Sequence, residues 1–203
     1  MAPSKDEVCL VIAGHFGLAA AVKSRERAVP LWALMLATQW LDVIFVPLFA
    51  ASIERLEPVP GTAGGYGSVL IYADYTHSFV GAVALAAMFG LVATLRWGAR
   101  GGTVLGGVVF SHWILDLIVH RADLPILPGN AGQLPRLGFG LWAFPAATAV
   151  AELALVVGGS FLYWRAAIET SRHANQSTKK ASITASSLLA FGVLTLVLNV
   201  LGL

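Results

Sequence analysis

The chain has 203 residues, of which 57% are hydrophobic and 12% are charged. Soluble domains carry roughly 25% charged residues, so this composition indicates a polytopic membrane protein with no room for a separate soluble catalytic domain. The net charge of +2 argues against nucleic-acid binding, and the single cysteine excludes both an intrachain disulfide and a cysteine-based zinc site.

Apolar runs separated by polar links divide the chain. Runs of about 20 residues match the hydrocarbon thickness of a bilayer, so the sequence predicts an all-α bundle of five to six spans. We expect one integral-membrane domain over residues 1–203, with spans near 8–22, 29–51, 68–95, 103–120, 139–164 and 183–203. The third run is longer than one span, so its tyrosine-rich start is expected to be interfacial.

The basic residues predict how the bundle is oriented. Most Lys and Arg residues fall in the links 23–27, 96–100 and 165–180, whereas the loop 52–67 is net negative. Under the positive-inside rule, the basic links lie on the cytoplasmic side and both termini lie outside. The prolines and glycines of residues 121–138 predict an irregular or re-entrant segment on that outer side.

One polar stripe interrupts the fourth apolar run. His112, Asp116 and His120 are spaced i, i+4 and i+8, so on a helix their side chains lie along one face. Ionisable groups at depth in a bilayer are costly, usually face the protein interior and are functional candidates by default. A second threonine-histidine pair, Thr76-His77, lies upstream.

Placing the polar residues by depth predicts a cluster in the outer half of the bundle. Its expected members are His15, Asp42, His77, His112, Asp116 and His120, with Glu152 near mid-depth. Imidazole and carboxylate groups bind zinc, manganese or iron, and a catalytic metal needs about three protein ligands and an open position. We expect a divalent metal on His15, His77, His112 and Asp116, with Asp42, His120 and Glu152 as candidate acid–base groups.

Structural interpretations of some of these residues remain open. His15 alone is equally consistent with a hydrogen bond to a neighbouring helix, and His120 with Asp123 beside Arg121 is consistent with an interfacial ion pair. Glu152 needs a partner, and His15 is the one expected across the bundle. The same cluster also suits a proton- or ion-coupled transporter, although no clear inverted repeat is present.

Several motifs carry a family resemblance over about residues 10–165. They are Gly14-His15, Gln39-Trp40-Leu41-Asp42, Tyr75-Thr76-His77-Ser78 and the stretch from Ser111-His112 through Asp116 to Leu124-Pro125. In these the chain resembles small bacterial inner-membrane proteins, some described as permease-like, that look related to the membrane-bound metal-dependent hydrolases. The chain departs from that family in having the single Asp42 where the family has paired aspartates, which counts against a binuclear site.

The resemblance implies a location in the bacterial inner membrane and metal-binding or catalytic roles for His15, Asp42, His77, His112 and Asp116. Together with the depth of the cluster, it predicts a metal-dependent hydrolase that acts near the outer leaflet. Membrane lipid is the expected surrounding partner, and an amphiphilic or small molecule is the expected substrate.

Overall fold

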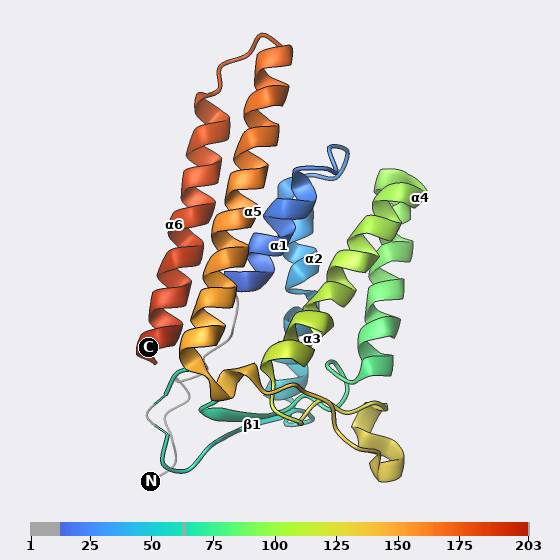
Figure 1. The fold of residues 1–203 in the computed structure, drawn as a ribbon. Helices are drawn as coiled ribbons and strands as arrows, with labels where there is room; N and C mark the ends of the chain where they lie inside the picture. Colours follow the sequence, from blue (N-terminus) through green and yellow to red (C-terminus); the bar gives the residue numbers. More distant parts are fainter. Residues whose placement is uncertain (1–12, 63, 203) are drawn as a thin grey trace.

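A computed structural model, which describes residues 13–62 and 64–202, is mostly helical (Figure 1). Three helices, α4, α5 and α6, are long and apolar enough to cross a membrane, and the bent pair α2 and α3 forms a fourth candidate. These helices support an integral membrane protein. The elements are α1 (Ala13–Lys23), α2 (Leu31–Thr38), α3 (Trp40–Ala50), β1 (Arg55–Pro58), β2 (Val69–Tyr72), α4 (Phe79–Val119), η1 (Pro128–Gln133), η2 (Leu141–Ala143), α5 (Pro145–His173) and α6 (Lys179–Leu201).

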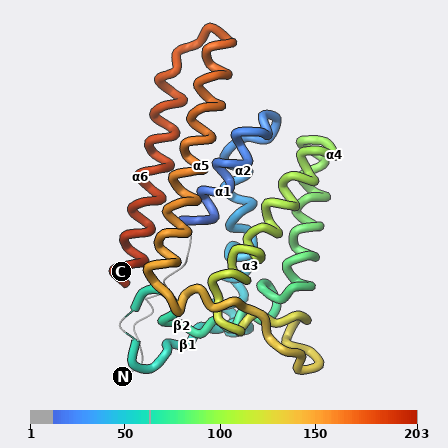
Figure 2. The backbone as a smooth tube through the Cα atoms, viewed as in Figure 1, coloured from blue at the N-terminus to red at the C-terminus, as the bar shows by residue number. Residues whose placement is uncertain are grey.

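Helix α4 is a hairpin of two helical arms. Gly98 leaves the helical conformation with φ 69° and ψ 176°, and the chain reverses there (Figure 2). Small residues let the arms approach closely, since a Cβ on Gly90 would lie 2.9 Å from the carbonyl oxygen of Gly102. The predicted link at 96–100 is helical apart from this single reversal, where glycine readily adopts the positive φ.

The run predicted at 29–51 is broken rather than continuous. Helices α2 and α3 meet at Gln39 with a bend of 48°. The last carbonyls of a helix lack intrahelical partners, so a break in the middle of a bundle leaves acceptors there for other groups. This break lies between Thr38 and Asp42, and both residues take part in the site described below.

Helix α1 lies between the pair α5 and α6 on one side and α2 on the other (Figure 1). Its contact with α5 depends on two glycines. A Cβ on Gly17 would lie 2.4 Å from the carbonyl of Leu155, and one on Gly159 would lie 1.9 Å from the carbonyl of Gly17. Such close backbone approach is typical of helix pairs in membranes, and it fixes the height of α1 against α5.

The end of the bundle opposite the basic links is closed by irregular chain. Strands β1 and β2 form an antiparallel hairpin in which Arg55 pairs with Tyr72, and the segment 121–138 lies beside it (Figure 2). Helix α4 begins only at Phe79, so the first part of the predicted span 68–95 is a strand and a loop, as its tyrosines suggested. The predicted segment 121–138 is irregular, as expected.

Other predicted boundaries need correction. Helix α5 begins at Pro145 and continues to His173, so the span predicted at 139–164 is shifted and most of the predicted loop 165–180 is helical. Charged side chains in this last stretch are exposed, which a helix leaving the membrane tolerates. The last span, predicted at 183–203, corresponds to α6, and residues 8–12 of the first predicted span lie outside the described residues.

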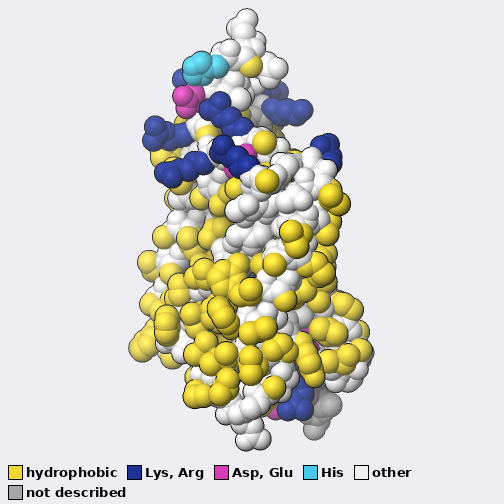
Figure 3. Space-filling model, turned by 90° about the vertical axis from the view of Figure 1, so that its right-hand side faces the viewer, with side chains coloured by type: hydrophobic (Ala, Val, Ile, Leu, Met, Phe, Trp, Pro, Cys, Tyr) yellow, Lys and Arg dark blue, Asp and Glu magenta, His cyan; other side chains and the backbone are white. Residues whose placement is uncertain are grey.

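The surface of the molecule suits a lipid environment. Hydrophobic side chains cover most of the visible face, and Lys and Arg side chains gather near its upper end (Figure 3). The loop after α1, the reversal in α4 and the loop between α5 and α6 all lie at that same end (Figure 1). The three basic links therefore share one end of the bundle, as the positive-inside rule requires.

Candidate metal centre

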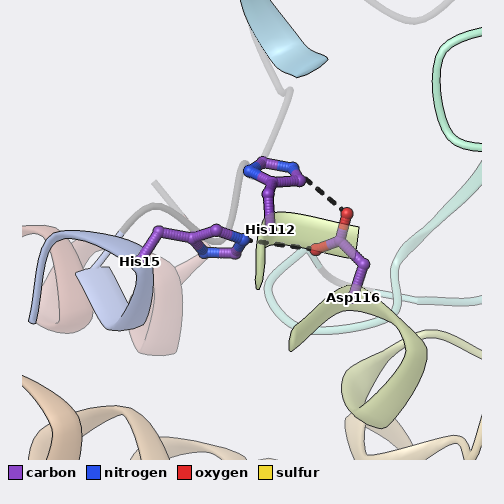
Figure 4. Close-up of side chains that lie close together, drawn as sticks. All are labelled: His15, His112 and Asp116. Atoms are coloured by element: carbon purple, nitrogen blue, oxygen red, sulfur yellow. Dashed lines mark ion pairs between the residues drawn. The ribbon is translucent and has the colours of Figure 1, made fainter. Parts of the chain in front are cut away.

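Five of the residues singled out from the sequence lie together in the structure. His15 comes from α1, Asp42 from the first turn of α3, His77 from the connection before α4, and His112 and Asp116 from the second arm of α4. The carboxylate of Asp116 faces the imidazoles of both His15 and His112, with a different oxygen toward each ring (Figure 4). Four of these side chains are buried, and only Asp42 is partly exposed, at 20%.

The ring nitrogens and carboxylate oxygens converge on a small volume. The Nε2 atoms of His77 and His112 are 3.3 Å apart. Oδ2 of Asp116 lies 3.1 Å from Nε2 of His112 and 3.5 Å from Nε2 of His77. The carboxylate of Asp42 contacts both rings: Oδ1 is 3.4 Å from Nε2 of His77, and Oδ2 is 3.7 Å from Nε2 of His112.

The second ring nitrogen of His112, Nδ1, makes a hydrogen bond that determines the tautomer of the ring. Nδ1 of His112 lies 2.5 Å from the carbonyl oxygen of Thr38, at the end of α2. A carbonyl can only accept, so this nitrogen carries a proton. In the neutral ring, Nε2 then has a lone pair directed at His77 and the two carboxylates.

His77 is oriented in the same way by a longer chain of contacts. Its Nδ1 lies 2.8 Å from Oγ1 of Thr76, which is 2.9 Å and 3.0 Å from the two carboxylate oxygens of Glu54. The hydroxyl donates to the carboxylate, so it accepts from Nδ1 of His77, and Nε2 again has a lone pair. The indole of Trp113 donates to the carbonyl of His77 at 2.9 Å, which holds this loop against α4.

The Nε2 atoms of the two imidazoles face two carboxylates inside the protein. Positive charge stabilises this arrangement, either as protons on the rings or as a cation bound to the lone pairs of the neutral rings. Ligands of a tetrahedral site with bonds near 2.1 Å are separated by about 3.4 Å. The separations among His77, His112 and Asp116, from 3.1 to 3.5 Å, match one face of such a tetrahedron. These buried groups could hold a metal ion.

His15 approaches the same site from the opposite side of Asp116. Its Nε2 lies 3.5 Å from Oδ1 of Asp116, and its ring lies 4.1 Å from that of His112. Since Oδ2 of Asp116 faces His77 and His112, this carboxylate bridges His15 and the two other imidazoles. The geometry allows two overlapping ligand groups, His15 with His112 and Asp116, and His77 with His112 and Asp42.

Two other candidates have contacts of their own. Nδ1 of His120 lies 2.9 Å from Oδ1 of Asp123, and the ring packs on Trp142, so the contact left open by the sequence is present. The hydroxyl of Tyr66 donates to Oε2 of Glu152 at 2.6 Å. The contact expected between Glu152 and His15 is thus replaced, among the described residues, by one with Tyr66. Neither His120 nor Glu152 is among the groups that surround His112.

Sequence reasoning missed the residues that orient the imidazoles. Glu54 was grouped with the acidic loop 52–67, but its side chain is buried and accepts from the backbone N–H groups of Tyr75 and Thr76 at 2.9 Å and 2.8 Å. Thr38 contributes a backbone carbonyl, which no side-chain pattern reveals. The one usable signal was Thr76 directly before His77.

The chain matches no protein family model, no curated protein and no solved structure. What can be said of the site therefore comes from the contacts of its own residues.

Proposed function

We propose that this protein is a membrane-embedded, metal-dependent hydrolase. Its resident cation would be zinc, manganese or iron, and its site would be near the outer face of a bacterial inner membrane. The kinship with membrane-bound metal-dependent hydrolases is part of this proposal, and it rests on the motifs around His15, Asp42, His77 and His112.

We also propose six membrane crossings, formed by α1, the pair α2 and α3, the two arms of α4, α5 and α6. Each arm of α4 is roughly 30 Å long at 1.5 Å per residue, which suits the hydrocarbon thickness of a bilayer. Six crossings agree with the placement of the three basic links at one end of the bundle and of the β-hairpin at the other.

The observation that carries the proposal is that two oriented imidazoles, His77 and His112, direct Nε2 at the same carboxylate. Both Nδ1 atoms are occupied, by the carbonyl of Thr38 and by the hydroxyl of Thr76, so both neutral rings present the Nε2 lone pair to a cation between them and the carboxylates. Metal-binding histidines characteristically donate their second N–H to such a partner. His77, His112 and Asp116 then supply the three protein ligands that catalytic zinc sites have, with a fourth position open.

In the proposed mechanism the residues divide between binding and proton transfer. A divalent cation held by His77, His112 and Asp116 would lower the pKa of a bound water and polarise the scissile group. The carboxylate of Asp42 contacts the two imidazoles and is the most exposed of the site's side chains, so it would act as the general base that accepts a proton from water. His15 contacts the outer oxygen of Asp116 and holds that carboxylate in position.

The position of the cluster suits a substrate that reaches it from the membrane surface. His77 precedes the first residue of α4, and His112 and Asp116 lie within two turns of its end at Val119. The site is thus close to one end of the bundle, whereas coupled transporters bind their substrates near the bilayer midplane. An amphiphile with its head group at the interface and its chain in the bilayer suits this depth.

Cation transport is the second candidate, and Asp42 is the observation in its favour. If Asp42 binds the cation as a fourth protein ligand, no position remains for water, and a closed site of this kind suits binding without hydrolysis. Flux of the bound metal into proteoliposomes, with no cleavage of any ester, would support transport.

Elemental analysis of the detergent-purified protein tests the metal site. We expect near-stoichiometric zinc, manganese or iron in the wild type and at least ~100-fold weaker metal binding in His112→Ala, because that ring contacts both carboxylates. His120→Ala is the matched control, since His120 is also buried at this end but contacts Asp123.

Hydrolysis is then tested with a panel of lipid esters and phosphoesters on the metal-loaded protein. We expect cleavage in the wild type and at least ~100-fold lower kcat in Asp42→Asn with metal retained, as for a lost general base. A wild type that binds none of the three metals after incubation would rule out this proposal.

A further inference from the structure

A cavity with a basic lining lies at the end of the bundle opposite the metal centre. It encloses about 340 Å³ between the end of α1, the last turns of α5 and the start of α6. Three cations line it: Lys23, Arg27 and Lys180. Small-ligand sites in proteins have volumes of about 300–1,000 Å³, so the space is sufficient for a head group.

Two cations of this cavity, Arg27 and Lys180, have no ion-pair partner among the described residues, whereas Lys23 interacts with the Glu26 carboxylate. No carboxylate lines the cavity, and no ion pair joins Arg27 or Lys180 to another described residue. The two acids nearby in sequence do not line it: Glu26 binds Arg100 at 2.9 Å, and Glu169 is exposed on α5. The cavity is therefore electropositive.

The side chains available as hydrogen-bond donors can be assigned. The ammonium group of Lys23 donates to the carbonyls of Glu26, Arg27 and Val29 at 3.3, 3.0 and 2.8 Å, so it contributes charge rather than free donors. Arg27 and Lys180 are free to donate to a ligand. Hydroxyl groups of Ser24, Ser171 and Thr184 also line the space.

Neighbouring aromatic residues place the cavity at the membrane surface. Tyr163 lines it, and the indole of Trp164 donates to Oγ of Ser182 at 3.3 Å. Tyrosine and tryptophan concentrate where hydrocarbon meets the head groups, and the apolar part of α6 begins directly after, at Ile183. A ligand in the cavity would lie at the height of lipid phosphates.

We propose that this cavity binds a phosphate-bearing anion, presented by the head group of an anionic phospholipid. Basic pockets between transmembrane helices on the cytoplasmic side characteristically bind such head groups. Binding here would connect α1 to α5 and α6 through Arg27 and Lys180. This site is independent of the metal centre and of the proposed hydrolase activity.

The test compares two double variants that remove the same charge from the same face. Arg27→Gln with Lys180→Gln alters the cavity lining, whereas Arg25→Gln with Lys179→Gln alters neighbours that do not line it. Each protein is reconstituted in nanodiscs of phosphatidylcholine with phosphatidylglycerol, and bound phosphatidylglycerol is counted by native mass spectrometry. We expect roughly 30-fold weaker binding in the first variant and wild-type binding in the second.

Two further arms complete the experiment. Inorganic phosphate is titrated against the wild type in phosphatidylcholine alone: binding at the same two residues would assign the site to free phosphate, and no binding would assign it to lipid. If the double variant does not fold, Lys180→Gln is compared with Lys179→Gln. Equal loss of phosphatidylglycerol from lining and non-lining variants, or no binding of either anion to the wild type, would overturn the proposal.

Discussion

The two ends of this bundle carry charge in opposite ways. At one end, Asp42, Asp116 and Glu54 are largely buried, and each has named partners within the protein. At the other end, Arg27 and Lys180 are exposed, and neither forms an ion pair with another described residue. Buried ions require partners that are fixed in place, whereas cations at a membrane surface can interact with lipid and water.

The difference means that changes at the two ends should have effects of very different size. Removing one member of a buried polar network leaves its partners without hydrogen bonds, and this costs more than the original bond contributed. Removing an exposed charge leaves its partner in contact with water, and this costs little.

The largest effect is expected for Glu54→Ala. The change leaves two backbone N–H groups and the hydroxyl of Thr76 without their buried acceptor, which should lower the free energy of unfolding by about 2–4 kcal/mol. It should also weaken metal binding by about 10–100-fold, because His77 loses its orientation. Thermal unfolding in detergent and metal titration measure the two effects.

The neighbouring acid provides the control. Glu57 lies on β1 with 47% of its side chain exposed, and among the described residues its carboxylate pairs with Arg55, which is also exposed, so Glu57→Ala should leave both measurements unchanged. A metal affinity in Glu54→Ala equal to that of the wild type would show that this carboxylate does not position His77.

A smaller and more selective effect is expected for Thr76→Val. Valine keeps the shape of the side chain but removes the hydroxyl between His77 and Glu54. The two backbone donors to Glu54 remain, so stability should fall by only about 1–2 kcal/mol. Metal binding should weaken by about tenfold, and Thr76→Ser, which restores the hydroxyl, should restore the affinity. Failure of serine to rescue binding would argue against the proposed tautomer of His77.

The smallest effect is expected at the opposite end, for Arg100→Gln. Arg100 contacts Glu26 at 2.9 Å, but 81% of its side chain is exposed. Only 7% of the Glu26 side chain is exposed, so its carboxylate is left with the backbone N–H of Ala28 as a donor. Loss of the pair should therefore lower stability by about 1 kcal/mol, and metal content should not change. Thermal unfolding at low and high salt measures this, and a change in metal affinity would contradict the independence of the two ends.

The carboxyl group of Glu26, in the loop between α1 and α2, predicts a weak dependence of stability on pH. The backbone N–H of Ala28, and then Arg100, favour the charged form of Glu26 and lower the pKa of its carboxyl, although burial opposes this. A lowered pKa in the folded protein means that the stabilisation is present above the ordinary glutamate pKa and is lost as pH falls through the folded value. Glu26→Gln should remove this part of the acid dependence, which thermal unfolding across that pH range would detect.

Much of the site was predictable because its residue types are rare inside a membrane. The i, i+4 spacing of His112 and Asp116 on an apolar helix required a shared face, and they do share one. His15, Asp42 and His77 could be grouped with them by depth alone. Glu54 could not, since an acidic residue in a polar loop has the same pattern whether it is solvated or buried.

The sequence alone determined the membrane class and the few polar residues that such an environment does not tolerate without partners. Hydropathy and charge are properties of each residue, and they are visible in the chain. Only the tertiary structure decided the reversal at Gly98, the break at Gln39 and the partners of each imidazole. These depend on where one backbone meets another, and contacts such as the carbonyl of Thr38 on His112 leave no trace in composition or spacing.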